Sequence, residues 1–151
     1  MTDVKHFNIR VYGILENEKE EILLSDEYVL DRYMTKFPGG GLNFGEGPED
    51  CIRREALEEF GQPVEIIEHY YTTGFFQKAL FYDDHQLISI YYRIRLTAPP
   101  GFRISEKAFD FEGKVNGSQS FRWVHPEEIE PEDLTFPIDR FVLRKLQETG
   151  G

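Results

Sequence analysis

The segment Pro48–Phe60 is the clearest helix signal in the first half of the chain, and it limits the fold because strand-forming sequence precedes and follows it. Pro48 suits the first position of a helix, and Glu49 and Asp50 complement the positive charge at the helix start. Gly61 suits the position just after the last turn, where a left-handed backbone ends many helices. A helix with these boundaries between extended segments predicts a fold that combines helices with a sheet.

Most of the remaining chain is rich in strand-forming residues. We expect the first strand at Phe7–Leu15 and a hairpin partner for it at Glu21–Leu24, across the polar turn ENEKE. Further extended segments are expected at Thr35–Phe37, Val64–Thr73, Phe75–Tyr82, Leu87–Thr97 and Gln119–Val124. Strands interleaved with helices predict an α+β domain in which a mixed sheet carries one helix on each face.

The last third of the chain adds a loop and a second helix. Ala98–Ser118 has few periodic apolar positions, so we expect a long loop there. Ile138–Glu148 is expected to form a helix with Phe141, Val142 and Leu146 facing inward. No linker or internal repeat separates these elements, and 151 residues fit one domain over 1–151.

Charge and cysteine content limit the partners and the compartment. The formal net charge of −11, with no cluster of Lys and Arg, argues against binding of polymeric DNA or RNA. A small anionic substrate is compatible with this charge if a metal cation offsets the repulsion. Cys51 is the only cysteine, and neither a signal-peptide pattern nor a membrane-spanning run is present. We therefore expect a cytoplasmic protein without a membrane partner.

Three carboxylates lie close together on the first helix. At about 100° per residue, Glu55, Glu58 and Glu59 fall within an arc of roughly 100°, where their negative charges repel one another. A multivalent cation would remove this repulsion, and Mg²⁺ prefers oxygen ligands that it shares with substrate phosphates. The alternative is a solvated acidic face, which is the commoner role of such a helix. The acids adjoin an apolar stripe of Ile52, Ala56 and Phe60.

The loop before this helix is rich in glycine. Such residues allow the backbone to approach a ligand closely, and a carbonyl oxygen of the turn could supply one more hard ligand. Tight turns are the commoner reason for a glycine cluster, so this feature alone does not establish a site. The glycines are Gly39, Gly40, Gly41, Gly45 and Gly47.

The stretch Gly40–Gln62 resembles the Nudix box, the signature G-x5-E-x7-R-E-U-x-E-E-x-G-U of the Nudix hydrolase family, in which U is a bulky aliphatic residue. Two variable positions depart from the signature, because Ala56 is smaller than usual and Gln62 replaces an aliphatic residue. The lead-in KFPGG and the later FRWVHPEEI also resemble Nudix proteins, so the resemblance covers nearly the whole chain. The fixed positions are all filled, by Gly40, Glu46, Arg54, Glu55, Glu58, Glu59 and Gly61.

The resemblance implies an α/β/α sandwich with a loop–helix–loop catalytic motif, and hydrolysis of a nucleoside diphosphate linked to another group. Carried over to this chain, it makes Glu55, Glu58 and Glu59 the ligands of Mg²⁺, for which Mn²⁺ is expected to substitute. The carbonyl of Gly39 is a further expected ligand, and Glu55 is our first choice for the general base.

Two other box residues are expected to act on the acids or on the loop. The resemblance assigns Arg54 a structural salt bridge that orients the acids. Glu46 is expected to brace the loop or to support this arginine.

Residues outside the box are candidates for substrate binding. Family members often add an acid from elsewhere, and the long loop offers Glu106, Asp110 and Glu112, each of which is more commonly an ordinary loop acid. Arg10 and Lys36, on strands that lead toward the box, are candidate partners of the substrate phosphates. One or two of the many tyrosines and phenylalanines could stack on a nucleobase, although most belong to the core.

The box does not identify the substrate. Oxidised nucleotides, ADP-ribose, dinucleoside polyphosphates, nucleotide sugars and capped RNA suit different relatives, and the negative charge disfavours capped RNA. The main alternative is a Nudix-fold protein that binds a nucleotide without cutting it, although such proteins tend to lose box acids. A homodimer is a frequent assembly in the family.

Overall fold

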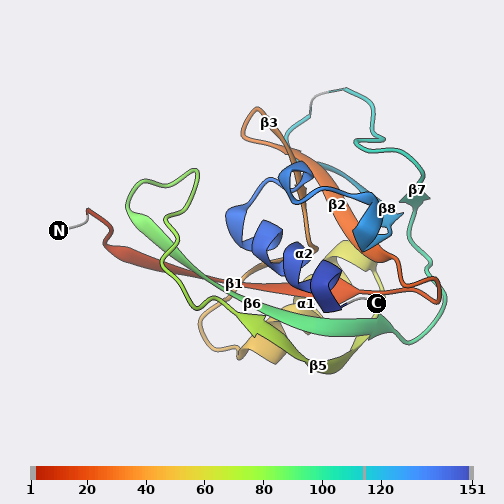
Figure 1. Ribbon diagram of the computed structural model, residues 1–151, viewed down its shortest axis with the longest axis horizontal. Coiled ribbons are helices and arrows are strands. Elements are labelled where there is room, and N and C mark those ends of the chain that lie inside the picture. The colour runs from red at the N-terminus through yellow and green to blue at the C-terminus, as the bar shows by residue number, and fades with distance from the viewer. Residues whose placement is uncertain (1–2, 114, 150–151) are drawn as a thin grey trace.

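The computed structural model describes residues 3–113 and 115–149, in which two runs of strands are each followed by helical segments (Figure 1). The strands are β1 (His6–Leu15), β2 (Ile22–Val29), β3 (Arg32–Lys36), β4 (Gly39–Gly41), β5 (Val64–Thr72), β6 (His85–Leu96), β7 (Ile104–Ser105) and β8 (Ser118–Val124). The helices are α1 (Pro48–Phe60), α2 (Pro137–Thr149) and the 3₁₀ turns η1 (Pro126–Glu128) and η2 (Pro131–Asp133).

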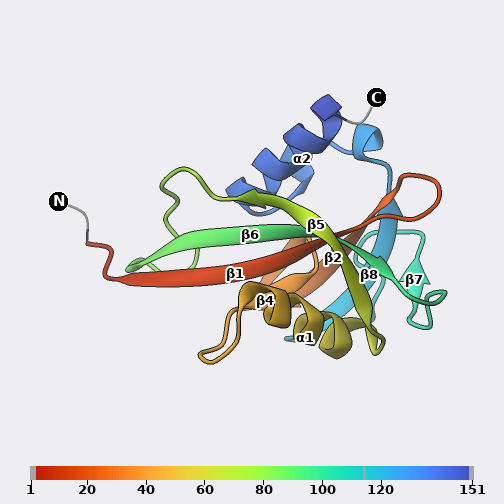
Figure 2. The ribbon, with the colours of Figure 1, turned by 90° about the horizontal axis from the view of Figure 1, so that it is seen from below.

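The strands form two four-stranded sheets. One has the order β4-β1-β6-β5 and is mixed, because β1 and β6 run parallel while the other neighbours are antiparallel. The other has the order β3-β2-β8-β7. Figure 2 shows α1 on one side of the β1–β6 layer and α2 on the other. The α+β architecture with one helix on each side is therefore confirmed, and the second sheet is an addition to the single mixed sheet that we expected.

Helix α1 has the bounds expected from the sequence. Its N-terminal proline removes a backbone donor that would otherwise lack a partner. At its end, Gly61 adopts φ 69° and its N–H bonds the carbonyl oxygen of Leu57, which is the left-handed cap that favours glycine. Local sequence signals therefore position the acids of this helix.

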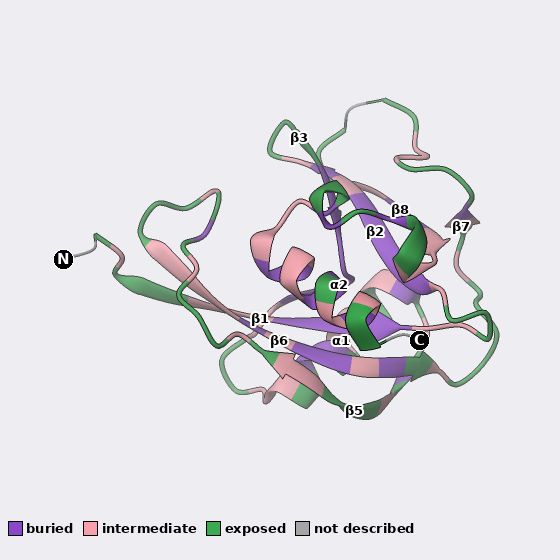
Figure 3. Ribbon diagram, viewed as in Figure 1, coloured by how far each residue is buried: buried purple, intermediate pink, exposed green. Residues whose placement is uncertain are grey.

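The hairpin expected between Phe7–Leu15 and Glu21–Leu24 is wrong. Strand β2 pairs with β3 and β8 in the other sheet, and it meets β1 only through an isolated bridge between Glu16 and Ile22. The physical reason is that the backbone groups along both edges of β2 are already bonded to β3 and β8, which makes it a central, buried strand with no edge left for β1. Figure 3 shows this burial along β2.

The strand expected at Phe75–Tyr82 is also wrong. This segment forms a loop that reaches the sheet through one isolated bridge between Lys78 and Gln86. Its large apolar side chains are not buried on one face, since Phe76 and Tyr82 remain more than half exposed. The expected long loop between β6 and β8 is present, with the short strand β7 inside it.

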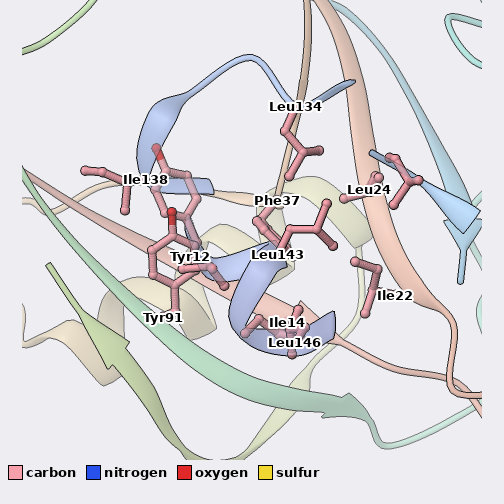
Figure 4. Packing of buried hydrophobic residues seen from close by; sticks show 12 residues of the cluster. Tyr12, Ile14, Ile22, Leu24, Phe37, Tyr91, Leu134, Ile138, Leu143 and Leu146 are labelled. Atoms are coloured by element: carbon pink, nitrogen blue, oxygen red, sulfur yellow. The ribbon is translucent and has the colours of Figure 1, made fainter. Parts of the chain in front are cut away.

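Two apolar clusters hold the layers together. The cluster beneath α2 contains Tyr12, Phe37, Tyr91 and Leu143 among its buried members, and Figure 4 shows them converging on one another. A second cluster beneath α1 includes Ile52 of that helix. Val142 and Leu146 are buried as expected, whereas Phe141 is only half-buried and packs on the ring of Tyr71. No helix in the described residues is long and apolar enough to cross a membrane.

Candidate active site

Arg54 of α1 connects the glycine loop to the acids of the helix. Its Nε and Nη2 donate to the two carboxylate oxygens of Glu46 at 3.0 and 2.7 Å, and its Nη2 also donates to the carbonyl of Gly41 at 3.0 Å. Its Nη1 donates to Glu55 at 3.0 Å and to Glu58 at 3.2 Å. These hydrogen bonds lower the pKa of Glu46 to about 2 and raise the pKa of the arginine. One guanidinium thus fixes the loop and two of the three clustered acids.

Glu55 lies against the backbone of the glycine strand. A Cβ placed on Gly40 would lie 2.4 Å from Oε1 of Glu55, which is closer than real Cβ contacts. Gly39 has φ 144°, and a Cβ there would lie 2.2 Å from the carbonyl oxygen of Val11. Close approach to the backbone of β1 therefore requires glycine at Gly39, whereas a Cβ at Gly40 would force the Glu55 carboxylate to move.

Glu59 has a different environment from the other two acids. Its Oε1 accepts a hydrogen bond from Nε2 of Gln119 at 3.1 Å, while its Oε2 is buried without a hydrogen-bond partner. Burial raises the pKa of Glu59 to about 7. The positive charge of Lys36 lowers this pKa in part, and the negative charge of Glu27 raises it further. A desolvated carboxylate oxygen without a partner is costly unless a ligand satisfies it.

The residues present fit a hard divalent cation. The candidate ligands are all oxygen atoms, which Mg²⁺ prefers, and they come from Glu55, Glu58, Glu59 and the carbonyl of Gly39. The Oε2 atom of Glu59, which has no hydrogen-bond partner, is free to bind the cation. Within 3–113 and 115–149, no three His, Cys, Asp or Glu side chains already converge as a complete set of metal ligands. The guanidinium of Arg54 forms ion pairs with two of these acids, Glu55 and Glu58.

A cavity of about 220 Å³ extends to Lys36, whose Nζ contacts the carbonyl oxygen of the candidate ligand Gly39. Its lining comes from both sheets, from the loop before β6 and from the start of α2, and it includes Lys36 and Arg10. Both cations lie near the ring of Tyr12, with Lys36 Nζ at 5.4 Å and Arg10 Cζ at 5.7 Å from the ring centre. The structure therefore brings together the two cations that the sequence analysis singled out.

Lys36 is buried and fully engaged. Its Nζ forms an ion pair with Glu27 at 3.3 Å and donates to the carbonyl oxygens of Phe37 at 3.0 Å and Gly39 at 3.5 Å. Burial lowers the pKa of the lysine, but the charges of Glu27 and Glu59 outweigh this effect and keep the pKa above its ordinary value. The ammonium group therefore remains charged beside the candidate ligands.

Sequence reasoning missed two acids that line the cavity. Glu27 projects from β2 beside Lys36, and a charged residue within an apolar strand was the only sequence signal for it. Asp139 is buried at the start of α2, where the hydroxyl of Tyr91 and the backbone N–H of Phe37 donate to it. Burial raises the pKa of Asp139 to about 6.

The acids expected in the long loop lie elsewhere. Asp110 pairs with Arg103 at 2.6 Å, and its N–H bonds the hydroxyl of Ser120. Ser120 and Gln119 are neighbours on β8, so their side chains point to opposite faces of the sheet, and Gln119 occupies the face that meets Glu59. Asp110 therefore lies on the face of β8 that is opposite to Glu59. Glu106 and Glu112 are exposed in the same loop.

Known proteins resemble the chain at several levels. The RNA pyrophosphohydrolase of Blochmanniella pennsylvanica (strain BPEN) is 36% identical over 70 residues, which are 44% of this chain and 44% of that protein. The 8-oxo-dGTP diphosphatase of Escherichia coli (strain K12) is 40% identical over 52 residues, or 32% of this chain and 40% of that protein. The chain therefore spans less than half the length of these relatives.

Solved structures extend the likeness to almost the whole fold. The MutT protein from Methanosarcina mazei Go1 superposes with a TM-score of 0.69 at 20% identity, over 97% of this chain and 96% of that one. The E. coli ORF135 protein gives a TM-score of 0.68 at 19% identity, over 97% and 92%. The family described as the NUDIX domain matches residues 6–145. Since this match covers nearly the full length of 151 residues, the chain belongs to the NUDIX domain family.

Proposed function

We propose that residues 1–151 form a single domain that hydrolyses a diphosphate bond in a nucleoside diphosphate-linked small molecule, with Mg²⁺ as its cofactor. The observation that carries the proposal is the environment of Glu59, whose buried Oε2 lacks a partner while the neighbouring acids of α1 are held by Arg54. The names of the two relatives, a pyrophosphohydrolase and a diphosphatase, point to the same kind of bond.

The acids of α1 share one role in this proposal, and one of them has a second. Glu55, Glu58 and Glu59, together with the carbonyl of Gly39, would hold the cation. When bound, Mg²⁺ neutralises charge on the phosphate oxygens and lowers the pKa of the attacking water. Glu55 is our candidate for the base that accepts the proton of this water. The carboxylate of Glu55 is held on one side by Arg54 and lies on the other side against the backbone of β4 at Gly40.

The cavity would receive the rest of the substrate. Arg10 supplies a positive charge that would meet the phosphates, and Lys36, whose ammonium is already paired with Glu27, adds positive potential to the lining. The aromatic rings of Tyr12 and Tyr91 form part of the lining. The polar end of the cavity thus lies near the candidate metal ligands, because Lys36 contacts both Glu27 and Gly39. The net charge of −11 favours a small nucleotide over an RNA chain, which would need a basic surface.

The direct test is hydrolysis of a panel of nucleoside diphosphate derivatives with Mg²⁺ or Mn²⁺ and identification of the products. Glu58→Gln and Glu59→Gln should each lower kcat by at least about 100-fold while circular dichroism shows an intact fold. Glu132→Gln, at an exposed ion pair with Arg144, is the matched control. Retained turnover in both α1 variants would contradict the proposal. Nucleotide binding without any product would favour a binding protein instead.

A further inference from the structure

Gln119 lies between acids from two different elements. It is the direct cross-strand neighbour of Glu27, since β2 and β8 pair in antiparallel register at these positions. Its Nε2 lies 2.9 Å from the hydroxyl of Ser25, 3.1 Å from Oε1 of Glu59 and 3.4 Å from Oε2 of Glu27. One side-chain amide therefore connects β2, β8 and the end of α1.

The chemistry of its neighbours fixes which way this amide faces. Two of the three contacting groups are carboxylates, which can only accept hydrogen bonds when ionised. The NH₂ group of Gln119 must therefore point at Glu59 and Glu27, because a carbonyl oxygen there would face acceptors. The Ser25 hydroxyl donates to Glu27 at 2.8 Å, which leaves its own lone pair free to accept from Gln119.

The acids of α1 thus receive support from two separate sources. Arg54 binds Glu55 and Glu58 from within the helix. Glu59 instead accepts from Gln119, and its second oxygen is the buried one without a partner. A hydrogen bond to one oxygen of a carboxylate restricts the rotation of the group and hence the direction of the other oxygen.

We infer that Gln119 is a positioning residue for Glu59, which fixes the orientation of that carboxylate for divalent-cation binding. The inference rests on the proposed function, because it takes Glu59 to be a metal ligand. The two N–H groups of Gln119 meet Ser25 and Glu59 at the shorter distances, Glu27 lies at 3.4 Å, and Lys36 balances the charge of Glu27. Loss of an outer support of this kind typically weakens metal affinity by about 10- to 100-fold.

The test uses the full chain and measures Mn²⁺ affinity by electron paramagnetic resonance, with kcat and KM measured separately. Gln119→Met removes the donor and keeps the length of the side chain. Gln119→Asn keeps an amide but shortens it, so that it no longer reaches Glu59. We expect both variants to raise the Kd for Mn²⁺ and to lower kcat by about 10-fold or more, with KM unchanged.

Gln147→Met is the matched control, because the amide of Gln147 bonds the carbonyls of Pro126 and Ile129 on the α2 side of the molecule. It should keep the Mn²⁺ affinity of the unsubstituted protein even if it lowers Tm. In a Glu59→Gln background, adding Gln119→Met should cause no further loss of affinity, because Gln119 acts through that carboxylate.

The outcomes separate this inference from the proposed function. Unchanged Mn²⁺ affinity in both Gln119 variants, alongside normal binding and hydrolysis by the unsubstituted protein, would overturn the role of Gln119 alone. A further loss of Mn²⁺ affinity when Gln119→Met is added to Glu59→Gln would also overturn the role of Gln119. Absence of Mn²⁺ binding by the unsubstituted protein would overturn both.

Discussion

Arg54 and Glu46 form a two-pronged ion pair, with Nε bonded to Oε2 and Nη2 to Oε1 of the carboxylate. The same glutamate accepts the backbone N–H of Asn43 at 2.8 Å, so it ties the glycine loop to the helix. A planar guanidinium held at both ends of its fork has little freedom to rotate. Its remaining nitrogen, Nη1, is therefore presented to Glu55 and Glu58 in a fixed direction.

Glu46→Gln should loosen this arrangement without unfolding the chain. The substitution keeps the shape of the side chain, but the amide can accept only one of the two hydrogen bonds from Arg54. We expect kcat to fall by about 10-fold, with normal far-ultraviolet circular dichroism, because the acids lose their outer support. The control is Glu65→Gln, which removes an exposed pair with Arg95. Equal kcat values for Glu46→Gln and the unsubstituted protein would show that the loop does not need this pair.

Gly40→Ala should displace Glu55 from its position. The new methyl group would lie 2.4 Å from Oε1 and 2.6 Å from Cδ of this carboxylate, so the side chain must move. Since Glu55 is the proposed base, we expect kcat to fall by about 100-fold. Gly74→Ala is the control, because its Cβ would meet only the Tyr71 hydroxyl at 3.8 Å, an ordinary contact. A crystal structure of Gly40→Ala with Glu55 unmoved would refute the steric argument.

Helix α1 shows what could be predicted from the sequence. Its start and end depend on local signals, a proline at the first turn and a glycine in the left-handed region after the last, so its bounds match the expectation. The ion pair of Arg54 with Glu58 also follows from the i, i+4 spacing on the helix, whereas the pair with Glu46 is one of two roles that the resemblance implies. Features set by a few neighbouring residues could thus be predicted from the chain alone.

Features that depend on strand pairing could not be predicted in this way. For β2, the sequence predicts an extended segment only at Glu21–Leu24, and nothing local distinguishes a hairpin with β1 from a central place in another sheet. Gln119 and Glu27 meet only because β2 and β8 pair in one register. In the sequence these two residues are separated by most of the chain, so no local signal predicts that they meet.

The stability of the metal-free protein should fall as pH rises, in part because of Glu59. In the folded chain the pKa of Glu59 is about 7, above its ordinary value of 4.5, so the folded state binds a proton that the unfolded state has released. This contribution to stability is fully present below about pH 4.5 and is lost as pH rises through about 7. Its size is on the order of 3 kcal/mol.

Urea unfolding at pH 5 and pH 8 in the presence of a chelator measures this effect. The unfolding free energy of the unsubstituted protein should fall more between these pH values than that of Glu59→Gln. Asp139, whose pKa is raised to about 6, acts in the same direction in both proteins, so the difference isolates Glu59. Mg²⁺ should restore stability at pH 8 by binding the ionised carboxylate. Parallel pH profiles for the two proteins would rule out this role of Glu59.

Arg10→Met should weaken substrate binding and leave the metal site intact. Arg10 lines the cavity, and its Nε donates to the Tyr12 hydroxyl at 2.8 Å, which holds the guanidinium in place. Loss of a charge-assisted bond to a phosphate should raise KM by about 10- to 100-fold, while Mn²⁺ affinity stays the same. Arg95→Met, which removes an exposed arginine on β6, is the control. If Arg10→Met instead lowered Mn²⁺ affinity with KM unchanged, the arginine would act on the acids of α1, and the cavity would lose its main cation for the phosphates.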